Sequence, residues 1–266
     1  MDRIKNWRKD LISSLEALEI NAQPINNQSF ELWSVTERTI LNLLSLGENV
    51  SPGDLVELQE SNQKRGIQVI HLWEDVWLTR RSQVLSRIKS FLGLNQRVYA
   101  RNTTVRKILR QEAEPFIEAN HLQGYVNARH AFALFHQETI IAVASFSNKR
   151  RMKEKGEAYY SAELVRFATK QGITITGGLT KLIKHYMFTY QPDDLMSYAD
   201  RDWSLGMGYI SAGFTLVGET PPQEILVQAE TYQRFFPDKR TSLPLPASTT
   251  FMKVTNSGNL KYIRTR

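Results

Sequence analysis

Two adjacent glycines, Gly177 and Gly178, open a segment with the apolar spacing of a helix, GGLTKLIKHYMFTY. Glycine lets the backbone approach a ligand closely, and the free N–H groups and dipole of a helix N-terminus attract negative charge. The pair therefore favours phosphate binding. A plain turn before a helix would contain the same two glycines, so the pair alone leaves both readings open.

Single side chains in the second half of the chain have types suited to proton transfer or anion binding. His121, in NHLQG, suits a proton shuttle because its usual pKa lies near neutrality; capping a helix end is the alternative. Asp200 follows an expected strand end and suits a general base, and Arg201 suits a phosphate; a surface ion-pair group is the alternative. Trp203 would stack on a flipped base or lie in the core. Arg166, charged between apolar neighbours in ELVRF, must face solvent, a cleft or a partner.

The composition narrows the chemistry and the partners. The 266 residues include 41% hydrophobic side chains, enough for a core, and no cysteine, which excludes disulfides, thiolate metal sites and cysteine nucleophiles,. A net charge of +7 favours a polyanion such as nucleic acid, and also suits an anionic cofactor,. The cations gather in two clusters, each of which is otherwise a solvated surface: Arg97, Arg101, Arg106, Lys107 and Arg110; and Lys149, Arg150, Arg151, Lys153 and Lys155,.

The sequence also indicates what not to expect. The first 20 residues mix charges with apolar positions, unlike a signal peptide or a membrane span, so we expect a cytoplasmic protein without a membrane partner,. The histidines lack the spacing of metal ligands, and we expect no metal. Glu74 and Asp75 are better suited to capping the helix that follows them than to ligating a cation.

The first part of the chain is predicted to contain three helices and a strand. Residues 1–20 carry an amphipathic helix, and 34–46 a second helix with Ser34 as N-cap and Glu37 three residues on,. Residues 66–73 form a buried strand, and a helix follows it to Gly93. A polar, basic stretch near residue 95 divides the chain into domains 1–95 and 96–266.

The second part alternates strands and helices. A helix at 111–120 precedes a hairpin that turns at Gln137 and Glu138,. From Ala162 to Glu219 we predict a strand, a glycine turn opening a helix, a strand, a short helix and a strand. The segment FMKVTNSGNLKYIR is predicted to be a terminal hairpin about NSGN,.

These segments resemble the GNAT acetyltransferases. ELVRFATKQGITITGGLTKLI is similar to that family's fourth strand and pyrophosphate loop, and YADRDWSLGMGYISAGFTLVGE to its fifth strand, last helix and GYxxxGF ending. The resemblance implies a mixed sheet flanked by helices and binding of acetyl-CoA or another acyl-CoA. It implies that Tyr209 is the acid that protonates the thiolate, with Asp200 or His121 as base. The implied cofactor contacts are Phe167, Ala168, Thr169, Gly177, Gly178, Leu179, Thr180 and Lys181.

One position departs from that pattern. Leu179 stands where the family usually has a second small residue, and no Arg or Gln precedes Gly177 by three residues. The side chain of Leu179 would either crowd the phosphates or point inward onto the sheet, and the sequence leaves both open.

A narrower resemblance points to nucleic acid. NHLQG, ELVRF, GGLTKL and SYADRDWSLGMGY are similar to the C-terminal half of phage homing-endonuclease-like proteins and to the phage Mu Mom type of DNA-modification protein. IQVIHLWEDVW resembles the last strand and helix of very-short-patch-repair nucleases, without their acidic strand, which implies a degenerate nuclease-like piece. With the basic clusters, the expected nucleic-acid contacts are Arg101, Lys149, Arg150, Arg151, Arg166, Arg201 and Trp203,.

The sequence thus predicts a GNAT-fold, acyl-CoA-dependent transferase that modifies nucleic acid, DNA rather than RNA. Two alternatives stay open: a non-catalytic GNAT-like module that binds nucleic acid, and a small-molecule or protein N-acetyltransferase. The acyl group, the acceptor atom and the oligomeric state do not follow from the sequence.

Overall fold

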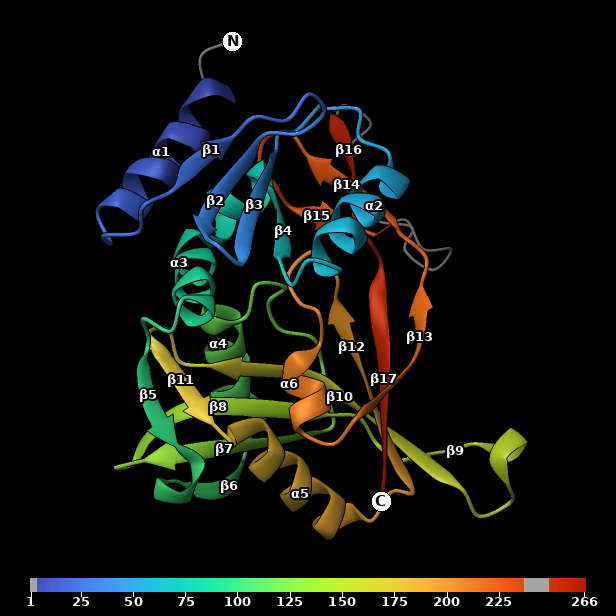
Figure 1. Cartoon of the computed structure of the whole chain (residues 1–266). Coiled ribbons are helices and arrows are strands. Elements are labelled where there is room, and N and C mark those ends of the chain that lie inside the picture. Colours follow the sequence, from blue (N-terminus) through green and yellow to red (C-terminus); the bar gives the residue numbers. More distant parts are fainter. Residues whose placement is uncertain (1–3, 237–248) are drawn as a thin grey trace. The chain divides into compact units, whose positions relative to one another are not determined.

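The chain divides into two compact units that interleave along the sequence. A computed structural model describes residues 4–236 and 249–266 (Figure 1). Unit 1 comprises Met1–Arg81, Asp200–Leu205 and Glu219–Asn259, and unit 2 comprises Ser82–Ala199, Gly206–Gly218 and Leu260–Arg266. The division predicted at residue 95 separates two continuous segments, whereas each unit is assembled from three.

Unit 2 is built on a mixed sheet of strand order β13-β17-β12-β10-β8-β7-β6, with β9 paired to β10 and a separate parallel pair β11-β5. Its strands are β5 (Gln96–Tyr99), β6 (Thr104–Ile108), β7 (His130–His136), β8 (Thr139–Phe146), β9 (Arg150–Arg151), β10 (Tyr160–Thr169), β11 (Ile173–Thr176), β12 (Asp194–Asp200), β13 (Thr215–Thr220) and β17 (Asn259–Thr265). Its helices are α4 (Arg110–Asn120), α5 (Gly178–Tyr190), α6 (Met207–Ser211) and the short η1 (Ala100–Asn102) and η2 (Lys153–Lys155).

Helices cover both faces of this sheet because its central strands are apolar on both sides. On β7, Phe132 and Leu134 belong to the core cluster that includes Leu182 and Tyr186 of α5. Ala133, between them, belongs to the cluster that includes Ile117 of α4. Alternate residues of a strand point to opposite faces, so one strand serves two layers. The predicted fold class, a mixed sheet flanked by helices, is confirmed.

The local predictions for unit 2 are largely confirmed. β7 and β8 form the expected antiparallel hairpin, and Gln137 and Glu138 at its turn have φ values of 48° and 60°. The order from β10 through α5, β12 and α6 to β13 is the one expected, with β11 added before the glycine turn. Two residues with positive φ between paired strands are typical of a tight hairpin turn.

The predicted terminal hairpin is wrong. β16 (Phe251–Thr255) pairs with β14 (Glu224–Gln228), whereas β17 lies in the large sheet between β13 and β12. The intervening turn is fixed elsewhere, because the buried carboxylate of Asp202 accepts hydrogen bonds from the N–H (2.8 Å) and Oγ (2.6 Å) of Ser257. Gly258 has φ +80°, and a Cβ there would lie 2.2 Å from the carbonyl oxygen of Thr220.

Unit 1 contains a sheet of order β1-β2-β3-β4 and a smaller one of order β15-β14-β16. Its remaining elements are α1 (Ile4–Glu16), β1 (Gln23–Ile25), β2 (Leu32–Thr36), β3 (Thr39–Leu44), α2 (Pro52–Gln63), β4 (Gln68–Trp73), α3 (Glu74–Phe91, which continues into unit 2) and β15 (Arg234–Phe235). The predicted first helix, strand 66–73 and third helix are confirmed. No helix within residues 4–236 and 249–266 is long and apolar enough to cross a membrane.

The helix predicted at 34–46 is wrong, because the segment forms β2 and β3. Glu37 and Arg38 make the turn of an antiparallel hairpin, so Ser34 and Glu37 do not cap a helix. β-Branched residues at Val35, Thr36, Thr39 and Ile40 favour strands. All six residues of β3 are buried, and a short apolar run with no polar face cannot be told from a buried helix by periodicity,.

His71 of β4 is a fully buried histidine whose two ring nitrogens are both hydrogen-bonded. Asn42 Nδ2 donates to His71 Nδ1 (3.0 Å), and His71 Nε2 donates to the carbonyl oxygen of Leu55 (3.1 Å). These partners require the neutral ring with its proton on Nε2. Burial lowers the pKa of His71 to about 4.

We expect the His71→Gln variant to lose less free energy of unfolding than the native chain as the pH falls. Unfolded histidine takes up a proton below about pH 6.5, whereas folded His71 stays neutral down to about pH 4,. The unfolded state therefore binds more protons in this window, which removes on the order of 3 kcal/mol of stability. Urea unfolding across the window measures both slopes. His136→Gln, at the end of β7, is the matched control substitution. An unchanged slope in H71Q contradicts the assignment.

Candidate functional site

The parallel strands β10 and β12 pair over a short length only. Ser161, Ala162 and Glu163 are in register with Asp194, Leu195 and Met196. Both strands continue, to Thr169 and to Asp200, but beyond this point β10 is in register with β8 alone, with a bulge between Leu164 and Arg166. One edge of β10 is therefore released from β12 after Glu163. Bulges re-aim side chains, and ligands favour the carboxyl ends of parallel strands.

The hydroxyl of Tyr209 lies where the two strands part. Ser197 Oγ of β12 is 3.0 Å from Tyr209 Oη and donates to the carbonyl oxygen of Leu164 on β10 (2.9 Å). The ring of Tyr209 stacks on Tyr262, with centroids 5.3 Å apart and planes at 22°. Burial raises the pKa of Tyr209 above its usual value of 10.0, so the phenol stays protonated at neutral pH and can act as a proton donor,.

The turn before α6 fits only glycine. Gly206 has φ +74°, and a Cβ there would lie 2.1 Å from Oη of Tyr262. The side chain of Tyr262 thus occupies the space that a Cβ would need, and the same ring supports Tyr209. The glycine and two tyrosines together fix the direction of the Tyr209 hydroxyl.

Charged side chains of α3 and β10 act on the pKa of this hydroxyl. Burial raises the pKa of Tyr209 most; the hydrogen bond with Ser197 and the positive charges of Arg87 and Arg166 lower it, and Glu163 raises it by a smaller amount. Burial raises the pKa of the half-buried Glu163, opposed by Arg166 and Arg150. Arg166 Nε donates to the carbonyl oxygen of Gly124 (3.1 Å). The carboxyl of Glu163 is thus a candidate proton acceptor at the same opening.

Sequence reasoning missed Glu163 and Ser197. Glu163 had a usable signal, because it is a charged residue in the apolar run AELVRF, the same argument that selects Arg166,. Ser197 had none, since its importance comes from contacts with Leu164 and Tyr209, on other elements.

The glycine pair begins α5 as predicted. Gly177 is the N-cap, with φ +75°. A Cβ on Gly178 would lie 2.7 Å from Cγ2 of Ile175 and 3.2 Å from Cδ1 of Leu134, so the helix start is pressed onto the strands. Leu179 packs against the core cluster of unit 2, as do Phe167 and Tyr209. Of the two placements open for Leu179, the structure has the inward one.

Lys181 is directed at protein backbone. Its Nζ donates to the carbonyl oxygens of Ala100 (2.8 Å) and Thr103. Lys181 therefore contributes its backbone, and not its ammonium group, to the first turn of α5.

His121, the C-cap of α4, accepts a hydrogen bond on Nδ1 from the N–H of Gln123 (3.1 Å).

The predicted DRDW segment lies in unit 1. The carboxylate of Asp200 accepts the N–H of Asp202 (3.0 Å). Arg201 is 8% exposed and forms ion pairs with Glu60 (3.1 Å) and Glu219 (2.7 Å). Trp203 is 7% exposed. A polyanion can reach Arg201 and Trp203 only if these contacts open. Asp200 belongs to unit 1 and Tyr209 to unit 2.

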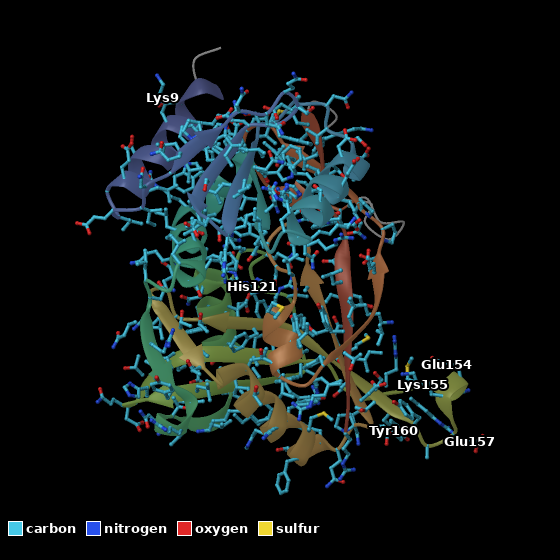
Figure 2. All side chains as sticks on the ribbon, viewed as in Figure 1. Lys9, His121, Glu154, Lys155, Glu157 and Tyr160 are labelled. Carbon is cyan, nitrogen blue, oxygen red and sulfur yellow. The ribbon has the colours of Figure 1, made fainter. Side chains whose placement is uncertain are left out.

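The remaining predicted contacts with nucleic acid are on the surface of unit 2. Lys149, Arg150 and Arg151 are exposed, and Lys149 Nζ lies 5.2 Å from the ring centroid of Tyr160. The segment Arg150–Tyr159, here called the β9 arm, contains β9 and η2 and leads into β10. Figure 2 labels Lys155 in this arm and Tyr160 at the start of β10. Lys155 anchors the arm through an ion pair with the buried carboxylate of Asp194 (2.7 Å).

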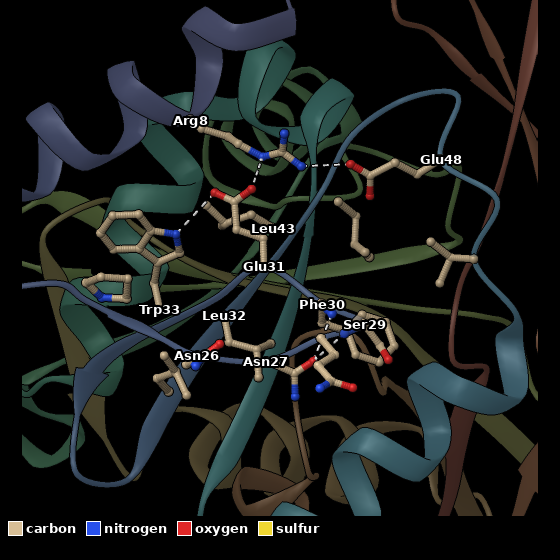
Figure 3. Close-up of a pocket in the computed structure, with 15 residues that line it drawn as sticks. Arg8, Asn26, Asn27, Ser29, Phe30, Glu31, Leu32, Trp33, Leu43 and Glu48 are labelled. Atoms are coloured by element: carbon tan, nitrogen blue, oxygen red, sulfur yellow. Dashed lines mark hydrogen bonds and ion pairs between the residues drawn. The ribbon is translucent and has the colours of Figure 1, made fainter.

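Unit 1 has a cavity of about 480 Å³ that contains none of the predicted site residues. Arg8 crosses it and pairs with Glu31 (2.9 Å) and Glu48 (2.7 Å), and Trp33 Nε1 donates to Glu31 (3.2 Å) (Figure 3). The positive charge of Arg8 is thus paired with two acids at this cavity.

Glu74 and Asp75 bind protein groups. Glu74 Oε2 accepts the N–H of Leu46 (3.0 Å), and Asp75 pairs with Arg234 at 2.5 Å. The described residues, 4–236 and 249–266, contain no group of three His, Asp or Glu side chains placed to hold a metal ion. The two carboxylates thus fasten the first turn of α3 to other parts of unit 1.

Comparison with known proteins gives structural likeness only. No protein-family model matches the chain, and no curated protein matches it. A Bacillus subtilis acetyltransferase solved in complex with CoA is 11% identical, with a TM-score of 0.38 over 62% of this chain and 99% of that one. A GNAT family acetyltransferase from Elizabethkingia anophelis with acetyl-CoA bound is 11% identical, with a TM-score of 0.37 over 62% of this chain and 99% of that one. The ribosomal-protein-S18-alanine N-acetyltransferase from Escherichia coli is 11% identical, with a TM-score of 0.36 over 61% of this chain and 93% of that one. Likeness at this level establishes neither a family nor an activity.

Proposed function

We propose that unit 2 is an acyl-CoA-dependent N-acyltransferase of the GNAT kind. The observation that carries the proposal is the hydroxyl of Tyr209, held by Ser197 where β10 and β12 part. The released edge of β10 and the first turn of α5 follow each other along the chain. Together they offer a proton donor, an open strand edge and a helix N-terminus in one unit.

The residues present fit an acyl-CoA. The strand edge at Phe167 to Thr169 suits the amides of an extended pantetheine arm, because an unpaired edge accepts an added extended chain,. The N–H groups of the first turn of α5 suit the pyrophosphate, and Leu179 leaves them uncovered because it packs inward,. When bound, the cofactor supplies an acyl group activated as a thioester.

The chain's own residues then account for the proton movements of acyl transfer to an amine. As the amine nitrogen bonds to the acyl carbon and the carbon–sulfur bond breaks, Tyr209 supplies a proton to the sulfur. The proton lost by the amine goes to Glu163. We prefer Glu163 to Asp200 and His121 as base, because Glu163 is the last residue of β10 in register with β12 and the other two side chains bind backbone N–H groups,.

We further propose that the acceptor amine belongs to nucleic acid. The support is the row of cations Lys149, Arg150 and Arg151, which leads into β10, together with the net charge of +7. Phosphate contacts by exposed Lys and Arg dominate the affinity of proteins for nucleic acid. The positive charge of this surface suits DNA and RNA alike.

We expect Tyr209→Phe to lower kcat for acetyl transfer about 100-fold while the KM for acetyl-CoA stays unchanged. The phenol is lost but the ring and its stacking remain. Because burial raises the pKa of Tyr209 above its usual value of 10.0, ionisation of this phenol should lower the rate of the native enzyme only above pH 10. Release of free CoA with DNA as acceptor measures turnover by thiol reagent, without background from a chain that lacks cysteine.

Tyr125→Phe is the control for that measurement and should leave kcat unchanged. Equal rates for Y209F and the native chain would remove Tyr209 from the reaction. Release of CoA with a small primary amine but not with DNA would keep the transferase and overturn the acceptor.

We expect Thr180→Glu to weaken the binding of acetyl-CoA at least about tenfold, measured by calorimetry. An acid in the first turn of a helix stabilises the helix but repels a pyrophosphate bound there. Gln111→Glu adds the same charge to the first turn of α4 and should bind as the native chain does. Binding unaffected by T180E would contradict the pyrophosphate site, and no binding by the native chain would favour a non-catalytic module.

We expect the double variant Arg150→Gln, Arg151→Gln to bind DNA more weakly and with a smaller dependence on salt. Each lost phosphate contact lowers the slope of log affinity against log salt by about 0.9 for duplex DNA. The control R106Q/R110Q removes the same charge from residues closely paired with Glu138 (2.6 Å) and Glu114 (2.8 Å), whereas Arg151 lies 3.9 Å from the carboxylate of Glu157. Fluorescence anisotropy of a labelled duplex measures both; equal slopes for the two variants would overturn the assignment.

A further inference from the structure

The strand pair β5 and β11 brings an exposed tyrosine to the glycine turn. The two strands are parallel, and Tyr99, at the end of β5, is in register with Thr176, the residue before Gly177. Val98 and Ile175 are buried, whereas Tyr99 is 43% exposed. Because side chains alternate along a strand, Tyr99 and Thr176 share the face turned away from the core.

The turn after β5 is fastened to the start of α5. Lys181 Nζ donates to the carbonyl oxygen of Ala100 (2.8 Å), and Cβ of Ala100 lies 3.6 Å from the position of a Cβ on Gly177. Thr103 Oγ1 closes the turn by donating to the carbonyl oxygen of Ala100 (2.7 Å). Arg101 is therefore carried on a rigid turn that touches the helix N-terminus.

Arg101 and Tyr99 form a cation–aromatic pair with an uncompensated charge. The guanidinium carbon of Arg101 lies 5.0 Å from the ring centroid of Tyr99. Within the part of the chain that the structure describes, Arg101 forms no ion pair. The segments that meet here, 94–111 and 164–192, contain no acidic residue. The local field at this end of α5 is thus positive.

We propose that Tyr99 and Arg101 bind the 3′-phosphoadenosine end of the acyl-CoA: the ring of Tyr99 stacks on adenine and Arg101 binds the 3′-phosphate. The inference rests on the proposed function, which places the pyrophosphate at the first turn of α5. Aromatic rings stack on any base, and the guanidinium fork matches the oxygens of a phosphate. The two side chains sit next to that turn, as the nucleotide end of the cofactor requires.

This assignment separates Arg101 from the cations of the β9 arm. Arg101 was selected from the sequence as a contact with nucleic acid. The turn that carries it is fastened to α5, the proposed pyrophosphate-binding helix, because Lys181 donates to the carbonyl oxygen of Ala100. Arg150 and Arg151 lie on β9, paired with β10. A nucleotide cofactor explains why an aromatic ring and a cation occur together beside the glycine turn.

The test compares three ligands by calorimetry: CoA, dephospho-CoA, which lacks the 3′-phosphate, and adenosine 3′,5′-bisphosphate, which lacks pantetheine. We expect the native chain to bind CoA about tenfold more tightly than dephospho-CoA, the value of one charge-assisted phosphate contact. Arg101→Gln should bring this ratio close to one. Tyr99→Ala should weaken all three ligands about tenfold, and Tyr99→Phe should not. Both side chains are exposed, so the variants should fold.

The control Arg110→Gln removes an exposed cation paired with Glu114 and should keep the native ratio. Binding of CoA with an equal ratio in the native chain and R101Q would overturn this inference and leave the transferase proposal standing. So would unchanged CoA binding by R101Q with weakened DNA binding, which would return Arg101 to nucleic acid. No binding of CoA by the native chain would overturn the proposed function and this inference together.

Discussion

Two neighbouring strands that stop pairing leave backbone groups that must be satisfied in some other way. In unit 2 this happens where β10 and β12 part after Glu163 and Met196. Ser197 meets the requirement on one side by donating to the carbonyl oxygen of Leu164, and in doing so it reaches Tyr209. The Ser197 hydroxyl thus serves both the backbone of the sheet and the placing of the proposed proton donor.

The sequence predicted features whose cause is local. Gln137 and Glu138 mark a tight turn between two apolar runs, and Gly177 with Gly178 marks a helix start, because each pattern acts over a few neighbouring residues. Tyr209 was selected by resemblance to a motif of similar length, and its role in proton transfer stays a prediction. The helix expected at 34–46 failed for a local reason as well, since Ser34 and Glu37 imitate a helix cap while the buried strand β3 shows no alternation,.

What could not be predicted depends on partners far along the chain. Arg201 and Trp203 look like surface groups in the sequence, yet they are buried, because Arg201 pairs with Glu60 and Glu219. The turn at Ser257 looks like the tip of a hairpin, but Asp202 holds it and the strands on either side join different sheets. The importance of Glu163 and Ser197 likewise follows from which strands are neighbours. Pairing of distant segments is information that periodicity does not contain.

The interleaving of the two units has a consequence for biosynthesis. The buried carboxylate of Asp75 pairs with Arg234, and the main-chain N–H of His71 donates to the carbonyl oxygen of Asp202, so both groups need partners that are synthesised much later. On the ribosome, residues 1–81 emerge well before these partners, so unit 1 cannot be completed until most of unit 2 has been synthesised. Chains usually fold domain by domain from the N-terminus. Here neither unit is complete until the other has been almost entirely synthesised, because each takes its last segment from residues after Gly218.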